Sequence, residues 1–170
     1  LGYPGSGKTY FSRKFAKEFH ILHLNSDRIR KSMFKEPKYN RYENQLVFGV
    51  MDALVEEALV IGISVIYDAN STLREYRRHL RKIAKEHKAR FFLLWFQTPI
   101  AAAKRRLGVR RRCTTKTCAL YHPPFPLEEF SRLKEKIEEP PKSEPHIIID
   151  GTATYAQQKK ALLTRIGAPQ

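Results

Sequence analysis

Short apolar runs alternate with longer amphipathic stretches along most of the chain. Four of the runs are rich in β-branched and aromatic residues and have the length of buried parallel strands. They are Ile21–Leu24, Ser64–Tyr67, Phe91–Phe96 and His146–Ile149. The stretches between them have the apolar spacing of helices. These predicted helices cover Lys8–Phe19, Asp27–Phe34, Glu43–Val60, Arg74–His87, Ile100–Arg112, Glu128–Glu138 and Tyr155–Ile166.

This alternation of strands and helices predicts an α/β fold with right-handed crossovers. A length of 170 residues suits a single domain, which we assign to residues 1–170. Two irregular segments, Lys35–Asn44 and Cys113–Pro126, are longer than tight connections and are expected to be functional loops or lids.

The chain opens with the pattern G-x-x-x-x-G-K-T, from Gly2 to Thr9. Its glycines let the backbone form a nest of N–H donors around a polyphosphate, and the helix after it directs its positive dipole end at the same anion. Lys8 would reach the β/γ-phosphates and the Thr9 hydroxyl would ligate Mg²⁺. We therefore predict ATP and Mg²⁺ as cofactors. The predicted nucleotide-binding residues are Pro4, Gly5, Ser6, Gly7, Lys8 and Thr9.

Such a loop normally follows a buried strand, yet only Leu1 precedes Gly2. We expect that a first strand is truncated in this sequence. With that strand restored, the sheet would have five parallel strands.

Asp68 ends a predicted strand, which is the pattern of an aspartate that holds Mg²⁺ beside a phosphate loop. The alternative is an aspartate that caps the following turn at Asn70, Ser71 and Thr72. The next residue is Ala69, whereas motor-type ATPases commonly have a glutamate there to activate water. This difference favours phosphoryl transfer to an acceptor over hydrolysis.

Asp27 lies just past the second apolar run, where strand ends meet the ligand crevice of an α/β sheet. A carboxylate there could orient an acceptor hydroxyl and take its proton. Arg30 follows one helical turn later on the same face and could anchor a phosphate. The alternative is that Asp27 or Ser26 only caps the helix.

The net charge of +15 favours polyanionic partners such as nucleotides, nucleic acid or acidic surfaces, although a solvated basic surface is the alternative. No Asp or Glu occurs between His87 and Leu127. Arg106 and Arg110 lie four residues apart in this segment and would share a helix face. They could neutralise a migrating phosphoryl group, or they could simply belong to a solvated basic helix end.

Two further groups of residues have open interpretations. Two thiols and an imidazole at short spacing could bind Zn²⁺, but they lack a local fourth ligand, so free thiols are favoured. These residues are Cys113, Cys118 and His122. Tyr39 and Tyr42 could stack on bases or could anchor their loop.

No apolar run is long enough to span a membrane, and no secretory signal is visible. The chain has only two cysteines, which do not make a disulfide framework. We therefore expect a cytoplasmic protein with no membrane partner.

Several motifs together resemble the P-loop kinases related to polynucleotide 5′-hydroxyl kinase. They are GYPGSGKT, LNSDRIRKSMF, RYENQLVFGVMDALVEEALVIGISVIYDAN and RRLGVRRR, and they cover Leu1 to about Arg112. Zeta-toxin-like and small-metabolite kinases share much of this layout. The resemblance implies a three-layer, nucleoside-kinase-like fold with strand order 2-3-1-4-5.

The resemblance also implies roles for individual residues. Asp27 would be the general base on the acceptor hydroxyl, Arg30 would contact a phosphate, and Asp68 would match the aspartate at the end of the third strand. Arg106 and Arg110, with Arg105 as an alternative register, would belong to a lid at about residues 105–127.

The leading hypothesis is an ATP- and Mg²⁺-dependent kinase whose acceptor is a polynucleotide 5′-hydroxyl, with Lys8, Asp27, Arg30, Arg106 and Arg110 as catalytic residues. One alternative is a kinase that acts on a small metabolite or a nucleotide sugar. Another is a non-catalytic, ATP-dependent module that binds nucleic acid.

Overall fold

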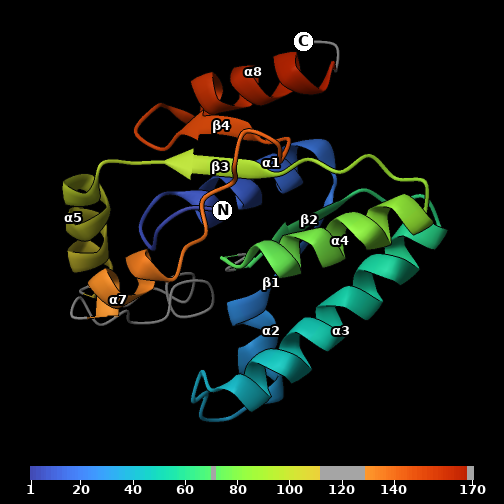
Figure 1. Ribbon diagram of the computed structural model, residues 1–170, viewed down its shortest axis with the longest axis horizontal. Coiled ribbons are helices and arrows are strands. Elements are labelled where there is room, and N and C mark those ends of the chain that lie inside the picture. The colour runs from blue at the N-terminus through green and yellow to red at the C-terminus, as the bar shows by residue number, and fades with distance from the viewer. Residues whose placement is uncertain (70–71, 112–128, 168–170) are drawn as a thin grey trace.

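The computed structural model describes residues 1–69, 72–111 and 129–167. Strands and helices alternate through most of this part of the chain, as the apolar pattern predicts (Figure 1). The elements are α1 (Lys8–Phe19), β1 (Leu22–Asn25), α2 (Ser26–Met33), α3 (Arg41–Val60), β2 (Val65–Asp68), α4 (Arg74–Glu86), β3 (Leu94–Gln97), α5 (Ile100–Arg111), α7 (Glu129–Glu135), β4 (Ile147–Asp150) and α8 (Tyr155–Ile166).

All four predicted strands are present, but each begins and ends one or more residues later than the apolar pattern indicates. The reason is that a polar residue closes each strand. Asn25, Asp68, Gln97 and Asp150 are the last residues of β1 to β4. The polar strand ends therefore belong to the hydrogen-bonded ladder itself, which fixes their positions relative to neighbouring strands.

Side-chain caps set the starts of several helices. The Asn40 side chain accepts a hydrogen bond from the Glu43 backbone N–H at 2.9 Å, so α3 begins two residues before the predicted start. At α8, Thr154 and Gln157 form a reciprocal capping box. In contrast, α7 ends at Glu135, three residues short of the predicted helix end.

The strands form two parallel pairs. In one pair β1 lies beside β2, with Asn25 opposite Asp68, and in the other β3 lies beside β4, with Gln97 opposite Asp150. Both pairs are neighbours in the predicted order 2-3-1-4-5, in which these strands would be numbered 2-3 and 4-5. In the described part of the chain no ladder joins β2 to β3. The five-strand sheet and its order stay a prediction.

Helices cover both faces of the strands and create three layers (Figure 1). On one face α1 and α8 enclose a core with Phe11, Phe96 and Ile149. On the other face α3 and α4 enclose a second core with Met51 and Leu80. The two cores are separate because successive residues of a strand point to opposite faces of its sheet. Burial of one side chain of this kind stabilises the fold by roughly 1.5–3 kcal/mol.

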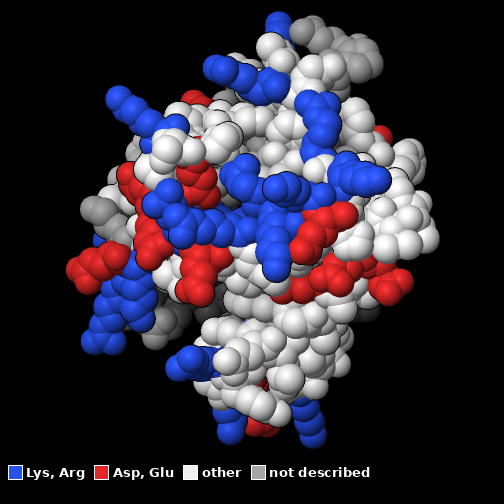
Figure 2. Space-filling view, turned by 45° about the vertical axis from the view of Figure 1, so that its right-hand side comes forward, with Lys and Arg blue, Asp and Glu red and all other residues white. Residues whose placement is uncertain are grey.

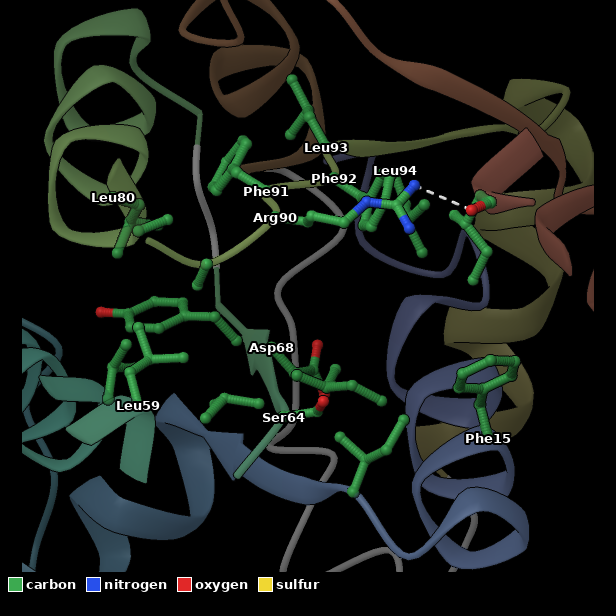
Figure 3. A pocket seen from close by; sticks show the side chains of 18 of the residues that line it. Phe15, Leu59, Ser64, Asp68, Leu80, Arg90, Phe91, Phe92, Leu93 and Leu94 are labelled. Atoms are coloured by element: carbon green, nitrogen blue, oxygen red, sulfur yellow. Dashed lines mark hydrogen bonds between the residues drawn. The ribbon is translucent and has the colours of Figure 1, made fainter. Parts of the chain in front are cut away.

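A cavity of about 680 Å³ lies between β2 and β3. Phe15, Leu59 and Leu80 reach it from different helices, and Asp68 lies on its wall (Figure 3). Leu1 borders the same cavity and pairs with β3. Its amino group donates to the Leu94 carbonyl at 2.6 Å, and the Phe96 N–H donates to the Leu1 carbonyl at 2.8 Å. The cavity therefore separates the two strand pairs along their length.

Candidate active site

The glycine-rich loop before α1 has the backbone conformation that its glycines permit. Gly5 and Gly7 have φ angles of 82° and 101°, in the left-handed region that disfavours other residues. A Cβ atom at Gly5 would also lie 2.4 Å from the Ala103 carbonyl oxygen, so a larger residue would collide with the backbone of α5. Only glycine fits the loop at this position.

The start of α1 places positive charge beside first-turn N–H groups that have no side-chain cap. Gly7 is the N-cap residue and has no side chain that could accept from the first-turn N–H groups. The Lys8 ammonium lies inside the loop, where it donates to the carbonyls of Gly2 at 2.6 Å and Tyr3 at 2.9 Å. Helix N-termini of this kind are anion-binding sites, so the geometry suits a phosphate group.

Asp68, at the end of β2, connects this loop to the neighbouring strand. The Thr9 hydroxyl donates to Asp68 Oδ1 at 3.3 Å, and the Asn25 amide donates to Asp68 Oδ2 at 2.8 Å. His23 Nε2 lies 3.0 Å from the same Oδ2. The pairing of Asn25 with Asp68 in the ladder explains why these side chains meet.

The surroundings of Asp68 keep it ionised and make it a suitable ligand for Mg²⁺. Burial raises its pKa, but hydrogen bonds from His23, Asn25 and Thr9 lower it more, so the pKa lies below the usual value. Mg²⁺ keeps several waters and takes few protein ligands beside substrate phosphates. The Asp68 carboxylate and the Thr9 hydroxyl match this preference for few protein ligands. Across the described ranges no group of three metal-binding side chains occurs.

A third side of the loop comes from α5 and from Thr98, directly after the end of β3. Arg106 Nη1 donates to the Gly5 carbonyl at 3.3 Å, which brings one predicted lid arginine onto the phosphate loop. Thr98 donates to the Ser6 carbonyl at 3.1 Å. The side chain of Arg110 and most of the predicted lid lie outside the described residues. Cys113, Cys118 and His122, which were considered for zinc, lie outside them too.

Asp27 is the second residue of α2 and does not cap that helix. The N-cap residue is Asn25, whose side chain accepts from the Arg28 backbone N–H at 2.9 Å. The alternative in which Asp27 or Ser26 is only a cap is therefore wrong. Asp27 thus lies close to a strand end, in the first turn of a helix, where α/β folds bind their ligands.

Arg30 is placed differently from an exposed phosphate anchor. Its side chain is 3% exposed and donates to Glu43 Oε2 at 3.0 Å and to Asn44 Oδ1 at 2.6 Å. Its Nε has no acceptor within the described part of the chain. Burial raises the pKa of Glu43, but donors from Lys38, Tyr39 and Arg30 lower it more. The contact between Arg30 and a phosphate stays a prediction.

Sequence reasoning missed three residues that organise the site. His23 and Asn25 alternate along β1 and therefore point to one side of the strand, toward Asp68. That alternation was visible in the sequence as polar positions within an apolar strand. Glu43 had no comparable signal, because its partners come from α2 and from the loop before α3.

The basic residues do not form a uniform positive surface. Figure 2 shows Lys and Arg side chains in a band across one face, with Asp and Glu side chains on both sides of it. Helix α4 contains six Lys or Arg residues, yet its Arg77 is fully buried and paired with Glu144 at 2.8 Å. None of the helices that the structure describes is both long and apolar enough to cross a membrane.

The fold and this site define an α/β domain of the phosphate-loop class, with a nucleotide-type anion site between strand ends. Residues 1–140 match the family model described as AAA domain (AAA_33). The chain belongs to this AAA domain family.

Sequence similarity to a known kinase supports the same phosphate-loop class. The chain is 30% identical over 105 residues to L-seryl-tRNA(Sec) kinase of Methanococcus maripaludis, an alignment that covers 58% of this chain and 40% of that protein. The chain thus spans less than half of this relative's length.

Solved structures share the fold at low sequence identity. Kti12 of Chaetomium thermophilum, in complex with ADP-AlF3, has a TM-score of 0.73 and 19% identity, with 99% of this chain and 96% of that chain covered. The APS kinase CysC of Mycobacterium tuberculosis, in complex with AMPPNP and APS, has a TM-score of 0.67 and 18% identity, with 99% and 95% covered. Kinases are thus found among both the relatives and the structural neighbours.

Proposed function

We propose that this chain is the catalytic domain of a kinase that transfers the γ-phosphoryl group of ATP to a hydroxyl group. One observation carries the proposal. Thr9 of the phosphate loop contacts Asp68, Asp68 pairs with Asn25, and Asp27 follows Asn25 by two residues. The anion site and a carboxylate not used as a cap therefore lie at the ends of two neighbouring strands, where α/β folds bind ligands.

The chain's own residues supply the parts that phosphoryl transfer requires. Lys8 and the loop N–H groups bind the β- and γ-phosphates, and Thr9 and Asp68 hold Mg²⁺, which neutralises phosphate charge when bound. Asp27 takes the proton of the acceptor hydroxyl. The freed oxygen bonds to the γ-phosphorus while the bond to the β-phosphate oxygen breaks and ADP leaves.

Arginines would balance the charge that moves during this step. Arg106 already lies 3.3 Å from the loop carbonyl of Gly5, so a small movement of its guanidinium would reach a bound phosphate. Arg110 would act from the same helix face, and Arg30 would contact a phosphate through Nε, which has no acceptor among the described residues. Ala69 after Asp68 favours transfer over hydrolysis, because it cannot activate water.

For the acceptor, we propose a hydroxyl carried by a nucleic acid, such as a polynucleotide 5′-hydroxyl. The net charge of +15 supports a polyanionic acceptor. The name of the relative, an L-seryl-tRNA(Sec) kinase, also describes action on an RNA-borne group. A small-metabolite acceptor is the second candidate, favoured by the likeness to an APS kinase in complex with APS.

Labelled ATP distinguishes these acceptors. The full-length protein is incubated with [γ-³²P]ATP and Mg²⁺, with 5′-hydroxyl DNA and RNA, with aminoacylated tRNA, and with a metabolite panel followed by ATP consumption. Label on nucleic acid supports the first acceptor class. ATP consumption with a metabolite alone overturns it and supports the second.

Asp27→Asn separates a kinase from a non-catalytic nucleotide-binding module. It keeps the size of the side chain but removes the base, so turnover should fall about 10³-fold while ATP affinity stays within twofold. Binding is measured with a fluorescent ATP analogue and turnover with the acceptor that gives label transfer. ATP binding without turnover in either form would contradict the kinase.

A further inference from the structure

Asn25 uses both ends of its side-chain amide inside the candidate site. It is the last residue of β1 and is 3% exposed. Its Oδ1 accepts from the Arg28 backbone N–H at 2.9 Å and caps the start of α2, while its Nδ2 donates to Asp68 Oδ2 at 2.8 Å. The amide cannot be turned around without loss of both bonds, because its NH₂ group would then face a donor and its oxygen a carboxylate. A single orientation of this side chain therefore joins the start of α2 to the end of β2.

The two oxygens of Asp68 are held from different sides. Oδ2 accepts from Asn25 and lies 3.0 Å from His23 Nε2, so side chains of β1 hold this oxygen. Oδ1 accepts from the Thr9 hydroxyl of the phosphate loop at 3.3 Å. Asn25 and Asp68 lie opposite each other in the parallel ladder, so their side chains leave the sheet on the same face. The bond from Asn25 to Oδ2 thus restricts rotation of the carboxylate and keeps Oδ1 toward Thr9.

The same side chain fixes the beginning of α2. The first-turn N–H groups of a helix have no partner within the helix, and an asparagine at the N-cap supplies one. Asp27, the proposed base, lies in this first turn, two residues after Asn25. The position of its backbone relative to Asp68 therefore depends on a residue that bonds to both the helix start and the carboxylate.

We propose that Asn25 is a positioning residue that holds the Asp68 carboxylate toward Thr9 and, with the other end of its amide, sets where Asp27 lies relative to Asp68. The proposal rests on the proposed function, in which Asp68 holds Mg²⁺ and Asp27 is the base. Phosphoryl transfer depends mainly on the relative placement of the phosphate and the acceptor. A buried amide that bonds to both sides keeps that placement constant.

The hold on Asp68 is tested by binding of a fluorescent, non-hydrolysable ATP analogue, measured with excess Mg²⁺ and again with EDTA. In Asn25→Ser the hydroxyl can still cap α2, because serine is a preferred N-cap residue, but it is one bond shorter than the amide and loses Asp68. Affinity with Mg²⁺ should fall about 10-fold and affinity in EDTA should stay within about twofold, since residues that orient a metal ligand affect metal binding. A merely structural role would lower both affinities alike.

Asn40→Ala is the matched control for this measurement. The Asn40 side chain caps α3 by accepting from the Glu43 N–H, also at 2.9 Å, so the variant loses a cap of the same kind. It should leave the ratio of the two affinities unchanged. An unchanged ratio in Asn25→Ser would overturn the proposal. Tighter binding with Mg²⁺ would also overturn it, because Asn25 would then compete with the metal for Asp68. Equal affinity with Mg²⁺ and with EDTA in the wild type would remove the metal site and the proposal with it.

The hold on α2 is tested by turnover at saturating Mg²⁺ with a 5′-hydroxyl oligoribonucleotide as the probe acceptor. Asn25→Ser should then approach the wild type. Asn25→Ala, which also loses the cap, should stay about 10-fold lower in kcat with the KM for ATP unchanged, since loss of orientation affects the chemical step. Equal kcat values for the two variants would overturn the role at α2. If wild-type protein transfers no phosphate to the oligoribonucleotide, the proposed acceptor fails, and the two nucleotide affinities still decide on Asn25.

Discussion

The two sides of the site are built in different ways. The phosphate side consists of the loop from Gly2 to Thr9 together with Asp68, and one stretch of backbone supplies most of its donors. The proposed acceptor side consists of Asp27, Arg30, Tyr39 and Glu43, which come from α2, α3 and the loop between them. The phosphate side thus depends on local backbone conformation, whereas the acceptor side depends on packing between two helices.

This difference indicates at which residues mutation can change specificity for the acceptor. A nest of backbone N–H groups needs glycines at fixed places and tolerates little variation. A cluster of side chains around a buried arginine can be altered residue by residue while α2 and α3 still pack. We therefore expect nucleotide binding and acceptor choice to respond separately to mutation.

The largest expected effect is on the phosphate side. Lys8→Ala removes the ammonium that lies inside the loop, and we expect turnover to fall about 10³-fold, with weaker binding of a fluorescent ATP analogue. Lys17→Ala, on the exposed side of the same helix, is the matched control and should keep near wild-type turnover. Normal ATP binding and turnover by Lys8→Ala would remove the loop from the proposed mechanism.

The next effect is on stability and concerns a buried ion pair that belongs to neither side of the site. Glu144→Gln leaves the fully buried Arg77 without its bidentate carboxylate, both of whose bonds are 2.8 Å long. The free energy of unfolding at pH 7 should fall by about 3 kcal/mol in urea titrations. Glu86→Gln, in the exposed Lys82–Glu86 pair, should change it by less than about 0.5 kcal/mol.

The same pair predicts a pH dependence. Arg77, as the largest cause, holds the pKa of Glu144 below its ordinary value of 4.5 despite partial burial. A lowered pKa in the folded state stabilises the protein above about pH 4.5, and this contribution is lost as the pH falls through the folded pKa. The wild type should therefore approach Glu144→Gln in stability at low pH. A constant difference from pH 7 to pH 3 would contradict the assignment.

The smallest expected effect separates the two sides directly. Glu43→Gln keeps the shape of the side chain but weakens its hold on Arg30 and on the turn at Tyr39. We expect kcat to fall about 10-fold with ATP affinity unchanged. Glu57→Gln, exposed on the same helix, is the control. A matching loss of ATP affinity in Glu43→Gln would show that the two sides are coupled after all.

The sequence predicted the phosphate side well because its information is contiguous. Three glycines, Lys8 and Thr9 fall within eight residues, and the spacing alone implies the loop conformation that Gly5 and Gly7 adopt. The contact between Thr9 and Asp68 was also foreseeable, since the ends of parallel strands meet at one edge.

The acceptor side was only partly foreseeable. Asp27 and Arg30 were found from their spacing after a strand, but helical spacing indicates a shared face and not its partners. Glu43 lies 13 residues from Arg30, and nothing in the sequence indicates that the two form a buried pair. The two interpretations left open for Tyr39, base stacking and loop anchoring, did not include the Arg30 guanidinium that lies 4.7 Å from its ring centroid.

The sequence alone was enough to predict the order of strands and helices along the chain and the phosphate loop. These follow from short-range rules of periodicity, glycine conformation and capping. Only the tertiary structure decided that His23 and Asn25 bond to Asp68, that Arg106 reaches the loop and that Arg30 is buried beneath Tyr39. Those contacts join residues far apart in the chain, and the packing of helices against the strand ends brings them together.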